Sequence, residues 1–335
     1  MKIIVDGFGG DNAPEAVVEG CVKAVEKFNV EVVITGDEQK INKVFEEKGF
    51  SKNNITICHT DEVIDMHDEA KLIMREKKNS SMGLGLQMVA KGEGDAFVSA
   101  GSTAALVVGA TAFVKRIKGV KRASLAAVIP HINGFYMLLD SGANIECRPE
   151  MLRSFAIMGS EYMEKIMNVN SPRVALLNNG VEDTKGRELE IETYKLLKET
   201  EDINFIGNIE ARQVPLGDCD VLVTDGFSGN ILLKTTEGMG KFMAISLSSL
   251  FKANFVSKIG AVCTMKGIKA LKEKMNYKNV GGAPLLGVRK PVIKAHGSSD
   301  ATAFMNAIRQ ANDFAKNDVI SKITESLEGM KIDDE

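Results

Sequence analysis

Polar, glycine-rich turns between a strand and a helix are the segments of this sequence that could do chemistry. The turn at residues 225–230 (Asp-Gly-Phe-Ser-Gly-Asn) follows the apolar run 221–223 and precedes a helical pattern. Free backbone N–H groups and the helix dipole both favour an anion at such a turn. Gly226 and Gly229 allow the positive φ angles and the close backbone approach that a tight turn requires. The pattern predicts an anion site at the carboxyl end of a strand.

Three further strand-to-helix turns carry the same kinds of residue. They lie at residues 7–12, 100–103 and 295–300, each directly after a short apolar run. Because the carboxyl ends of parallel strands meet at one edge of a sheet, we expect these turns to converge on one site. Their phosphate-binding candidates are glycines, hydroxyl residues and two aspartates: Gly9, Gly10, Asp11, Gly101, Ser102, Thr103, Gly226, Gly229, Gly297, Ser298, Ser299 and Asp300.

The candidate catalytic side chains each have an ordinary structural explanation as well. His296 could be a loop histidine whose hydrogen bonds are satisfied, and Lys185, in a polar turn ahead of a helix, could be a solvated lysine. Asp225 and Asp300 would repel phosphate directly, so a capping or lysine-orienting role is the better interpretation of both. The asparagines of the turns are common turn formers; they are Asn144 and Asn230.

Several stronger motifs are absent from the sequence. It contains no G-x-x-x-x-G-K-[ST] loop, no G-x-G-x-x-G after a strand and no G-x-S-x-G elbow. The histidines, which are His59, His67, His131 and His296, lack metal-ligand spacing. We therefore expect no metal, no cofactor and no covalent nucleophile.

Composition indicates a globular protein of a reducing compartment. The 335 residues are 44% hydrophobic and carry a net charge of −3, which gives no reason to expect nucleic-acid binding. The five scattered cysteines form no C-x-x-C pair, and residue 1 runs directly into a strand, so we expect a cytoplasmic protein without a signal peptide. The uncharged stretch 96–114 contains many Ser, Thr and Gly residues and fits a buried strand, turn and helix better than a membrane span.

The alternation of apolar runs and helical patterns predicts an α/β fold with a mostly parallel sheet covered by helices on both faces. Residues 124–129 and 135–140 read as an antiparallel hairpin. Helices are expected at 38–48, 66–78, 104–114, 150–167, 186–199 and 301–316. We expect Asp11 or Asn12 to cap the helix after the first turn, and Ser298 or Ser299 to cap the helix at 301–316. No linker divides the chain, so residues 1–335 are expected to form a single catalytic unit, either undivided or bilobed.

Residues 241–278 are strongly basic, although the whole chain has a net negative charge. They hold eight lysines against the single acid Glu273. Four apolar residues within this basic amphipathic segment, Phe251, Phe255, Ile259 and Val262, recur at helical spacing and are expected to share one face. This face could lie in a membrane interface, could pack in the core or against a second subunit, or could belong to a basic surface on which an acidic carrier protein docks.

The turns together resemble those of the bacterial phosphate acyltransferases, the acyl-acyl-carrier-protein–phosphate transacylases of phospholipid synthesis. The resemblance runs from residue 5 to residue 310. It rests on Asp-Gly-Phe-Gly-Gly-Asp (6–11), Lys-Lys-Asn-Ser-Ser-Met (77–82), Ser-Ala-Gly-Ser-Thr (99–103), Gly-Ala-Asn (142–144), Lys-Gly-Arg-Glu-Leu (185–189), the turn 225–230, Gly-Gly-Ala-Pro-Leu-Leu-Gly (281–287) and Ala-His-Gly-Ser-Ser-Asp-Ala (295–301). It departs at Gly101-Ser102-Thr103-Ala104, where the family has Gly-Asn-Thr-Gly, and in the less acidic turn 178–182.

The resemblance implies reversible transfer of a fatty acyl group from acyl carrier protein to inorganic phosphate. It implies a three-layer α/β/α Rossmann-like fold, related to the phosphotransacetylases and to the isocitrate and isopropylmalate dehydrogenases. A homodimer, peripheral membrane association and a downstream membrane glycerol-3-phosphate acyltransferase are also implied. Lys78, Ser81 and Asn144 join the phosphate-binding candidates, and Lys185, His296, Asp225 and Asn230 are the catalytic ones.

Phosphate is itself a nucleophile, so such a reaction needs an oxyanion-binding site rather than a strong base. Lys185 would neutralise phosphate or the oxyanion, and His296 would hydrogen-bond the same centre or protonate the leaving thiolate. A short-chain phosphotransacylase that uses coenzyme A and a non-catalytic membrane-surface scaffold are the alternatives. A dehydrogenase is disfavoured because the dinucleotide fingerprint is absent.

Overall fold

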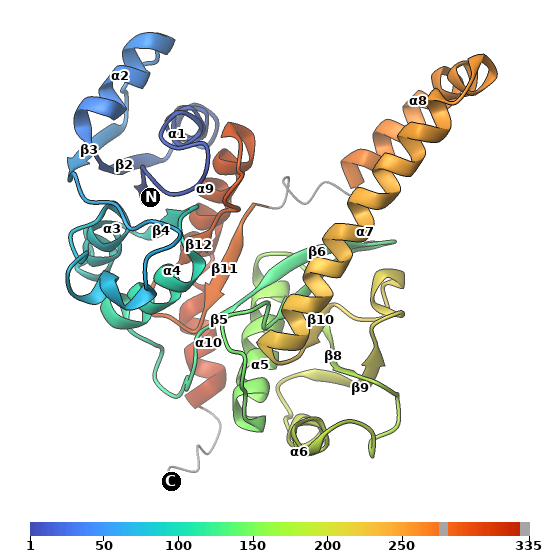
Figure 1. Ribbon diagram of the computed structural model, residues 1–335. Coiled ribbons are helices and arrows are strands. Elements are labelled where there is room, and N and C mark those ends of the chain that lie inside the picture. Colours follow the sequence, from blue (N-terminus) through green and yellow to red (C-terminus); the bar gives the residue numbers. More distant parts are fainter. Residues whose placement is uncertain (275–280, 329–335) are drawn as a thin grey trace.

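The computed structural model describes residues 1–274 and 281–328, whose strands form two sheets (Figure 1). The predicted α/β class with largely parallel strands is confirmed, but the strands are divided between a seven-stranded and a five-stranded sheet. The division follows from the hairpin predicted at 124–129 and 135–140. Its first strand breaks at Ala126, and the chain passes there from one sheet to the other.

The seven-stranded sheet carries three of the four predicted turns. In spatial order its strands are β3 (Ile55–His59), β2 (Glu31–Gly36), β1 (Lys2–Asp6), β4 (Ala96–Ser99), β12 (Val292–Lys294), β11 (Ala283–Leu286) and β5 (Ser124–Leu125). The first five are parallel, whereas β11 and β5 are antiparallel to their neighbours. Because β1, β4 and β12 are adjacent and parallel, the turns that follow them meet at one edge.

The five-stranded sheet carries the turn 225–230 and the segments of Asn144 and Lys185. Its strands are, in order, β6 (Ala127–His131), β7 (Gly134–Leu139), β10 (Val221–Val223), β8 (Arg173–Asn178) and β9 (Asn204–Glu210). The β6–β7 pair is antiparallel, as the hairpin predicts, and the other neighbours are parallel. The carboxyl ends of β7, β10 and β8 therefore lie side by side.

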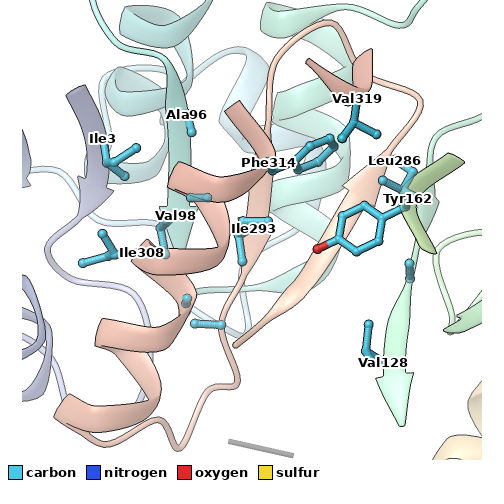
Figure 2. Close-up of a cluster of buried hydrophobic side chains, with 14 of the residues drawn as sticks. Ile3, Ala96, Val98, Val128, Tyr162, Leu286, Ile293, Ile308, Phe314 and Val319 are labelled. Atoms are coloured by element: carbon cyan, nitrogen blue, oxygen red, sulfur yellow. The ribbon is translucent and has the colours of Figure 1, made fainter. Parts of the chain in front are cut away.

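Helices cover both sheets and a single apolar core joins them. The first sheet is covered by α1 (Glu15–Phe28), α2 (Glu38–Lys48), α3 (Ser81–Ala90), α4 (Thr103–Gly109) and α9 (Ala301–Lys316), and the second by α5 (Pro149–Lys165), α6 (Glu188–Lys198) and the start of α7 (Gly226–Lys252). Core residues of both sheets, among them Ile3 and Val128, belong to one cluster, part of which Figure 2 shows. There Phe314 packs edge-on against Tyr162, whose hydroxyl accepts a hydrogen bond from Gln310, and α10 (Val319–Glu328) packs against α5. We infer one folded unit with two lobes.

The structure corrects three expectations about helices in the first lobe. The predicted helix at 66–78 is wrong, because only a 3-10 turn at Ala70–Met74 forms. The Lys77 ammonium instead donates hydrogen bonds to the Asp68 carboxylate and to the Val63 carbonyl. The cap of α9 is Asp300, which accepts from the Ala303 N–H at 2.9 Å, while Ser298 pairs with a histidine.

No side chain caps α1, contrary to the expectation for Asp11 or Asn12. The Asn12 amide is engaged elsewhere, since it donates to the Ser299 carbonyl. The remaining predicted helices form with small differences at their ends, and the one at 104–114 ends in a π-helical turn at Ala110–Val114.

The described part of the basic segment, residues 241–274, forms parts of two helices. The chain turns after α7, and α8 (Phe255–Lys274) begins where the Asn254 side chain accepts from the Ser257 N–H. Phe251 therefore lies on α7, and the prediction that it shares one helical face with Phe255, Ile259 and Val262 is wrong. Figure 1 shows α7 and α8 as antiparallel helices that project away from both sheets. Lys278 lies outside the described residues.

Candidate functional site

The three turns of the seven-stranded sheet contact one another. The Asp11 N–H donates to the Gly297 carbonyl at 2.8 Å, which joins the turn after β1 to the turn after β12. A Cβ atom at Gly9 would lie 2.6 Å from the Gly101 nitrogen, so the first and second turns approach too closely for any side chain at residue 9. The convergence predicted for residues 7–12, 100–103 and 295–300 is confirmed.

Two buried charged residues, Asp6 and Lys294, lie behind these turns. The Asp6 carboxylate accepts hydrogen bonds from the hydroxyls of Ser81 and Ser99, both at 2.6 Å. Burial raises the pKa of the Asp6 carboxyl, and the two hydroxyls oppose that rise. The Lys294 ammonium donates to the carbonyls of Ala100, at 3.2 Å, and Ala295. Burial lowers the pKa of Lys294 to about 8, with Asp6 and Asp11 acting in the opposite direction.

His296 has a defined orientation at the edge of the last turn. Its Nδ1 accepts from the Ser298 N–H at 3.2 Å and lies 2.8 Å from the Ser298 hydroxyl. Because Nδ1 accepts from a backbone N–H, a neutral imidazole here carries its proton on Nε2. Burial lowers the pKa of His296, which favours this neutral form. The side chain is therefore set to donate one hydrogen bond from Nε2.

The turns of the five-stranded sheet form a second set of contacts. The buried Asp140 carboxylate, at the end of β7, accepts from the backbone N–H groups of Gly142, Ala143 and Asn144 and from the Asn144 amide. Burial raises the pKa of Asp140, and these hydrogen bonds oppose the rise. The Asn144 carbonyl accepts from the Gly226 N–H at 2.7 Å, so the β7 turn packs against the start of α7.

Asp225 and Arg187 fix the start of α7 against the neighbouring β8 turn. Asp225 is 3% exposed and caps α7 by accepting from the Ser228 N–H at 2.8 Å. Its other oxygen pairs with the Arg187 guanidinium, which also binds Glu190. Lys185 lies two residues before Arg187 in the same turn, and its carbonyl accepts from the Asn178 amide at 3.0 Å. Asp225 is thus a capping residue whose charge is neutralised, and Lys185 is held in the turn by its backbone.

Helix α7 connects the two sets of turns. It begins at Gly226 in the second lobe, and its residues Lys234 and Glu237 both act electrostatically on His296 of the first lobe. Asn230, on the first turns of α7, lies against the β7 turn, because a Cβ atom at Gly142 would meet the Asn230 amide nitrogen at 2.6 Å. Asn230 at the start of α7 and His296 of the first lobe are therefore linked to the same helix, the first by contact and the second by charge.

Comparisons with known proteins identify the family of this chain. The profile of a family described as "Fatty acid synthesis protein" matches residues 1–322. A phosphate acyltransferase of Clostridium perfringens strain SM101 is 46% identical over 336 residues, covering 100% of this chain and 99% of the relative. The chain belongs to the phosphate acyltransferase family. A Bacillus licheniformis family member is 47% identical over 330 residues, covering 98% of both chains.

Solved structures support the same fold at low sequence identity. A phosphotransacetylase from Streptococcus pyogenes superimposes with a TM-score of 0.64 and 19% identity, over 98% of this chain and 94% of that chain. The EutD phosphotransacetylase from Staphylococcus aureus gives 0.60 and 17% over the same shares. Membership of the phosphate acyltransferase family makes the protein an acyltransferase that transfers an acyl group to phosphate.

The predicted site residues of this acyltransferase differ in whether their side chains are exposed. The Ser81 hydroxyl is occupied by Asp6, and Ser102 is nearly buried as the cap of α4. Exposed side chains at the turns are Asp11, Lys78, Lys185, Asn230, His296, Ser298 and Asp300. Lys78 lies one turn before α3, where its carbonyl accepts from the Gln87 amide at 2.7 Å.

Sequence reasoning assigns no role to four charged residues that organise the turns: Asp6, Asp140, Arg187 and Lys294. Three of them share a recognisable signal, a single charged residue that ends an apolar strand; they are Asp6, Asp140 and Lys294. An apolar strand buries its last residue, so a charge at that position requires a nearby polar partner. Arg187 carries no such signal, because it lies in a polar turn among other charged residues.

Proposed function

We propose that this acyltransferase takes a fatty acyl group from the thioester of acyl carrier protein and transfers it reversibly to inorganic phosphate. One observation carries the proposal: the polar turns of the five-stranded sheet pack on the start of α7, and Lys234 and Glu237, farther along the same helix, act electrostatically on His296 in the turns of the seven-stranded sheet. Such a surface favours a dianion and a developing oxyanion. In the described part of the chain, no cysteine or serine at these turns pairs with a histidine that could activate it, apart from Ser298.

In the proposed reaction a phosphate oxygen attacks the thioester carbon, and the tetrahedral oxyanion then collapses with cleavage of the C–S bond. The acyl phosphate keeps the new C–O bond, and the carrier thiolate takes a proton. Lys185 neutralises the phosphate or the oxyanion, and Asn230 donates an amide hydrogen bond at the start of α7. His296 donates from Nε2 and supplies the proton to the thiolate. Exposed side chains of the turns, among them Lys78, complete the phosphate site.

The test follows release of carrier thiol from a long-chain acyl carrier protein with and without phosphate, together with formation of acyl phosphate. We expect thiol release to depend strictly on phosphate and to match acyl phosphate one to one. Thiol release without phosphate would indicate a thioesterase, and absence of release would favour a scaffold.

A coenzyme A-dependent phosphotransacylase is the alternative with the same fold. An assay with acetyl-CoA at the same concentration as the acyl carrier protein shows which of the two is the better acyl donor. We expect acetyl-CoA to support a far lower rate than acyl carrier protein. Equal or greater rates with acetyl-CoA would reverse the assignment of the donor.

We also propose that the far end of the α7–α8 hairpin contacts a membrane surface. Phe255, Val256 and Val262 of α8 are 76%, 76% and 70% exposed, and Lys258 is exposed among them. Exposed apolar residues beside lysines suit an interface with anionic lipid. Within residues 1–274 and 281–328, no helix has the length and apolarity needed to cross a bilayer. Contact would therefore be peripheral, in a protein otherwise located in the cytoplasm.

Replacing Phe255 and Ile259 with Asp tests this surface, with Lys91→Ala at the exposed end of α3 as the control. We expect liposome co-sedimentation to be lost while soluble turnover stays intact. If liposome binding is kept and only turnover with acyl carrier protein is lost, the surface is a docking site for the carrier. If light scattering shows that the protein dissociates, the surface is a subunit interface.

The assembly and the fate of the product are the remaining parts of the proposal. Exposed apolar residues in the middle of α7, such as Phe242 and Ile245, offer a surface for a second copy, and we propose a homodimer. The acyl phosphate is an activated, hydrophobic acyl donor. We propose that it passes to a membrane glycerol-3-phosphate acyltransferase, which makes lysophosphatidic acid for phospholipid synthesis.

A further inference from the structure

The buried lysine at the end of β12 has no role in the reaction described above. Lys294 is 8% exposed and lies at the carboxyl end of a strand whose other residues are apolar. Its ammonium donates to the carbonyls of Ala100 and Ala295, which are the residues that begin the turns after β4 and β12. An ammonium is costly to bury, and an apolar residue of similar volume would fill the space without that cost. The position of the charge therefore points to function.

The electrostatic surroundings of Lys294 indicate what the charge does. Asp6 on β1 and Asp11 in the turn after β1 both attract the ammonium. Without Lys294 these carboxylates would repel a phosphate held by the three converging turns. Lys294 also lowers the pKa of His296, after the larger effect of burial, and so favours the imidazole form that donates from Nε2.

We propose that Lys294 is a positioning residue for the phosphate substrate: it joins the turns 100–103 and 295–300 and offsets Asp6 and Asp11 beside the anion. The inference rests on the proposed acyl transfer to phosphate and deepens it. Lys294 does not touch the reacting atoms. It acts through the two turns, through the local potential and through the protonation state of His296.

The charge of Lys294 predicts a pH dependence of phosphate binding. The group is protonated below its pKa of about 8 and loses its charge above it. Asp6, Asp11 and His296 are the titratable groups that face it; burial raises the pKa of Asp6 and lowers the pKa of His296, so His296 is neutral in this range. The KM for phosphate should therefore be lowest below pH 8 and rise above it, at pH values where phosphate is already dianionic.

The experiment compares Lys294→Met and Lys294→Arg with the exposed control Lys91→Met, using phosphate-dependent thiol release at about pH 7 and about pH 9, with each KM expressed as the concentration of the phosphate dianion. We expect Lys294→Met to raise the phosphate KM about tenfold, the effect of removing a local potential of a few kT. Its KM should no longer change with pH. Lys294→Arg should stay closer to the wild-type KM and show a smaller rise at the higher pH, because arginine keeps its charge. Proton NMR of His296 should show an upward pKa shift in Lys294→Met only.

Three outcomes would overturn the proposal. The first is a folded Lys294→Met variant with the wild-type phosphate KM. The second is a Lys294→Arg variant that retains the full wild-type rise of KM with pH, and this variant decides the question if Lys294→Met does not fold. The third is a wild-type protein that releases no thiol in response to phosphate, and it would contradict the proposed function as well as this inference. The first two outcomes contradict this inference but leave the proposed function intact.

Discussion

The buried charged residues behind the turns of the seven-stranded sheet are held by hydroxyls and carbonyls of the fold, whereas one buried carboxylate of the five-stranded sheet, Asp225, is paired with a side chain at the surface. Asp6 and Lys294 are 1% and 8% exposed and are held by hydroxyls and backbone carbonyls. In the other sheet Asp225 is equally buried, but the Arg187 side chain that neutralises it is 61% exposed. The first set of turns is therefore fixed by the fold. In the second set Asp140 fixes the β7 turn, but the start of α7 also depends on one long surface side chain, and a single substitution of that side chain should disturb it without unfolding the protein.

The largest expected effect comes from two glycine substitutions. Gly229 is required for packing, whereas Gly297 is expected to face the phosphate. A Cβ atom at Gly229 would lie 1.9 Å from the Asp140 carbonyl oxygen, whereas one at Gly297 meets only the Asp11 carboxylate, at 3.7 Å or more. We expect Gly229→Ala to lose about 3 kcal/mol of unfolding free energy and all turnover. Gly297→Val should change stability by less than about 1 kcal/mol but abolish phosphate-dependent turnover.

Denaturant unfolding and the thiol-release assay measure both glycine variants. A stable, active Gly229→Ala would mean that the α7 start is not packed on the β7 turn as described. A fully active Gly297→Val would mean that the last turn only connects β12 to α9.

The next effect concerns the exposed lysine of the second set of turns. Lys185→Ala should lower turnover by about 10²–10³, the usual cost of losing one preorganised oxyanion partner. Stability should be unchanged because the Lys185 side chain is exposed. Lys198→Ala, an exposed lysine at the end of α6, is the matched control. A loss of less than tenfold in a folded sample would exclude Lys185 from the site.

The smallest effect concerns the arginine that neutralises Asp225. Arg187→Met removes the ion pair and should cost about 1 kcal/mol, roughly fivefold in kcat/KM, because the Arg187 side chain is largely exposed to solvent. Most of the loss should fall on the phosphate KM. The double variant Arg187→Met/Asp225→Asn should recover activity, because asparagine can still cap α7 and the repelling charge is gone. Failure of this rescue would show that Arg187 acts by position and not by charge.

The sequence predicts the elements and turns of this protein better than it predicts their grouping. The alternation of strands and helices gives the α/β class, and the turn residues identify all four strand-to-helix turns. The division into two sheets depends on Ala126, where the Ala126 N–H bonds to the Pro284 carbonyl of a distant strand. Sequence spacing carries no information about such a long-range contact. The failed helix at 66–78 has a more local cause, because Lys77 is held by residues of the preceding loop.

The candidate site shows the same limit. His296, Asn230 and Lys185 are visible in the sequence because polar residues stand out in short turns. The partners of the charged residues are not visible in the sequence. Arg187 and Asp225 are 38 residues apart, and Lys294 contacts a carbonyl 194 residues away. Spacing predicts the wrong face for Phe251, because it does not reveal the reversal of the chain between α7 and α8.

The central claim is that turns from two different sheets serve one reaction centre, and a double-mutant cycle between Lys185 and His296 tests it most directly. The measured quantity is kcat/KM for phosphate in Lys185→Ala, His296→Ala and the double variant. If both side chains act on the same phosphate and oxyanion, the double variant should lose less than the product of the single losses. We expect a coupling free energy of about 0.5–3 kcal/mol. Strictly multiplicative losses would contradict the claim and would assign the two side chains to separate sites.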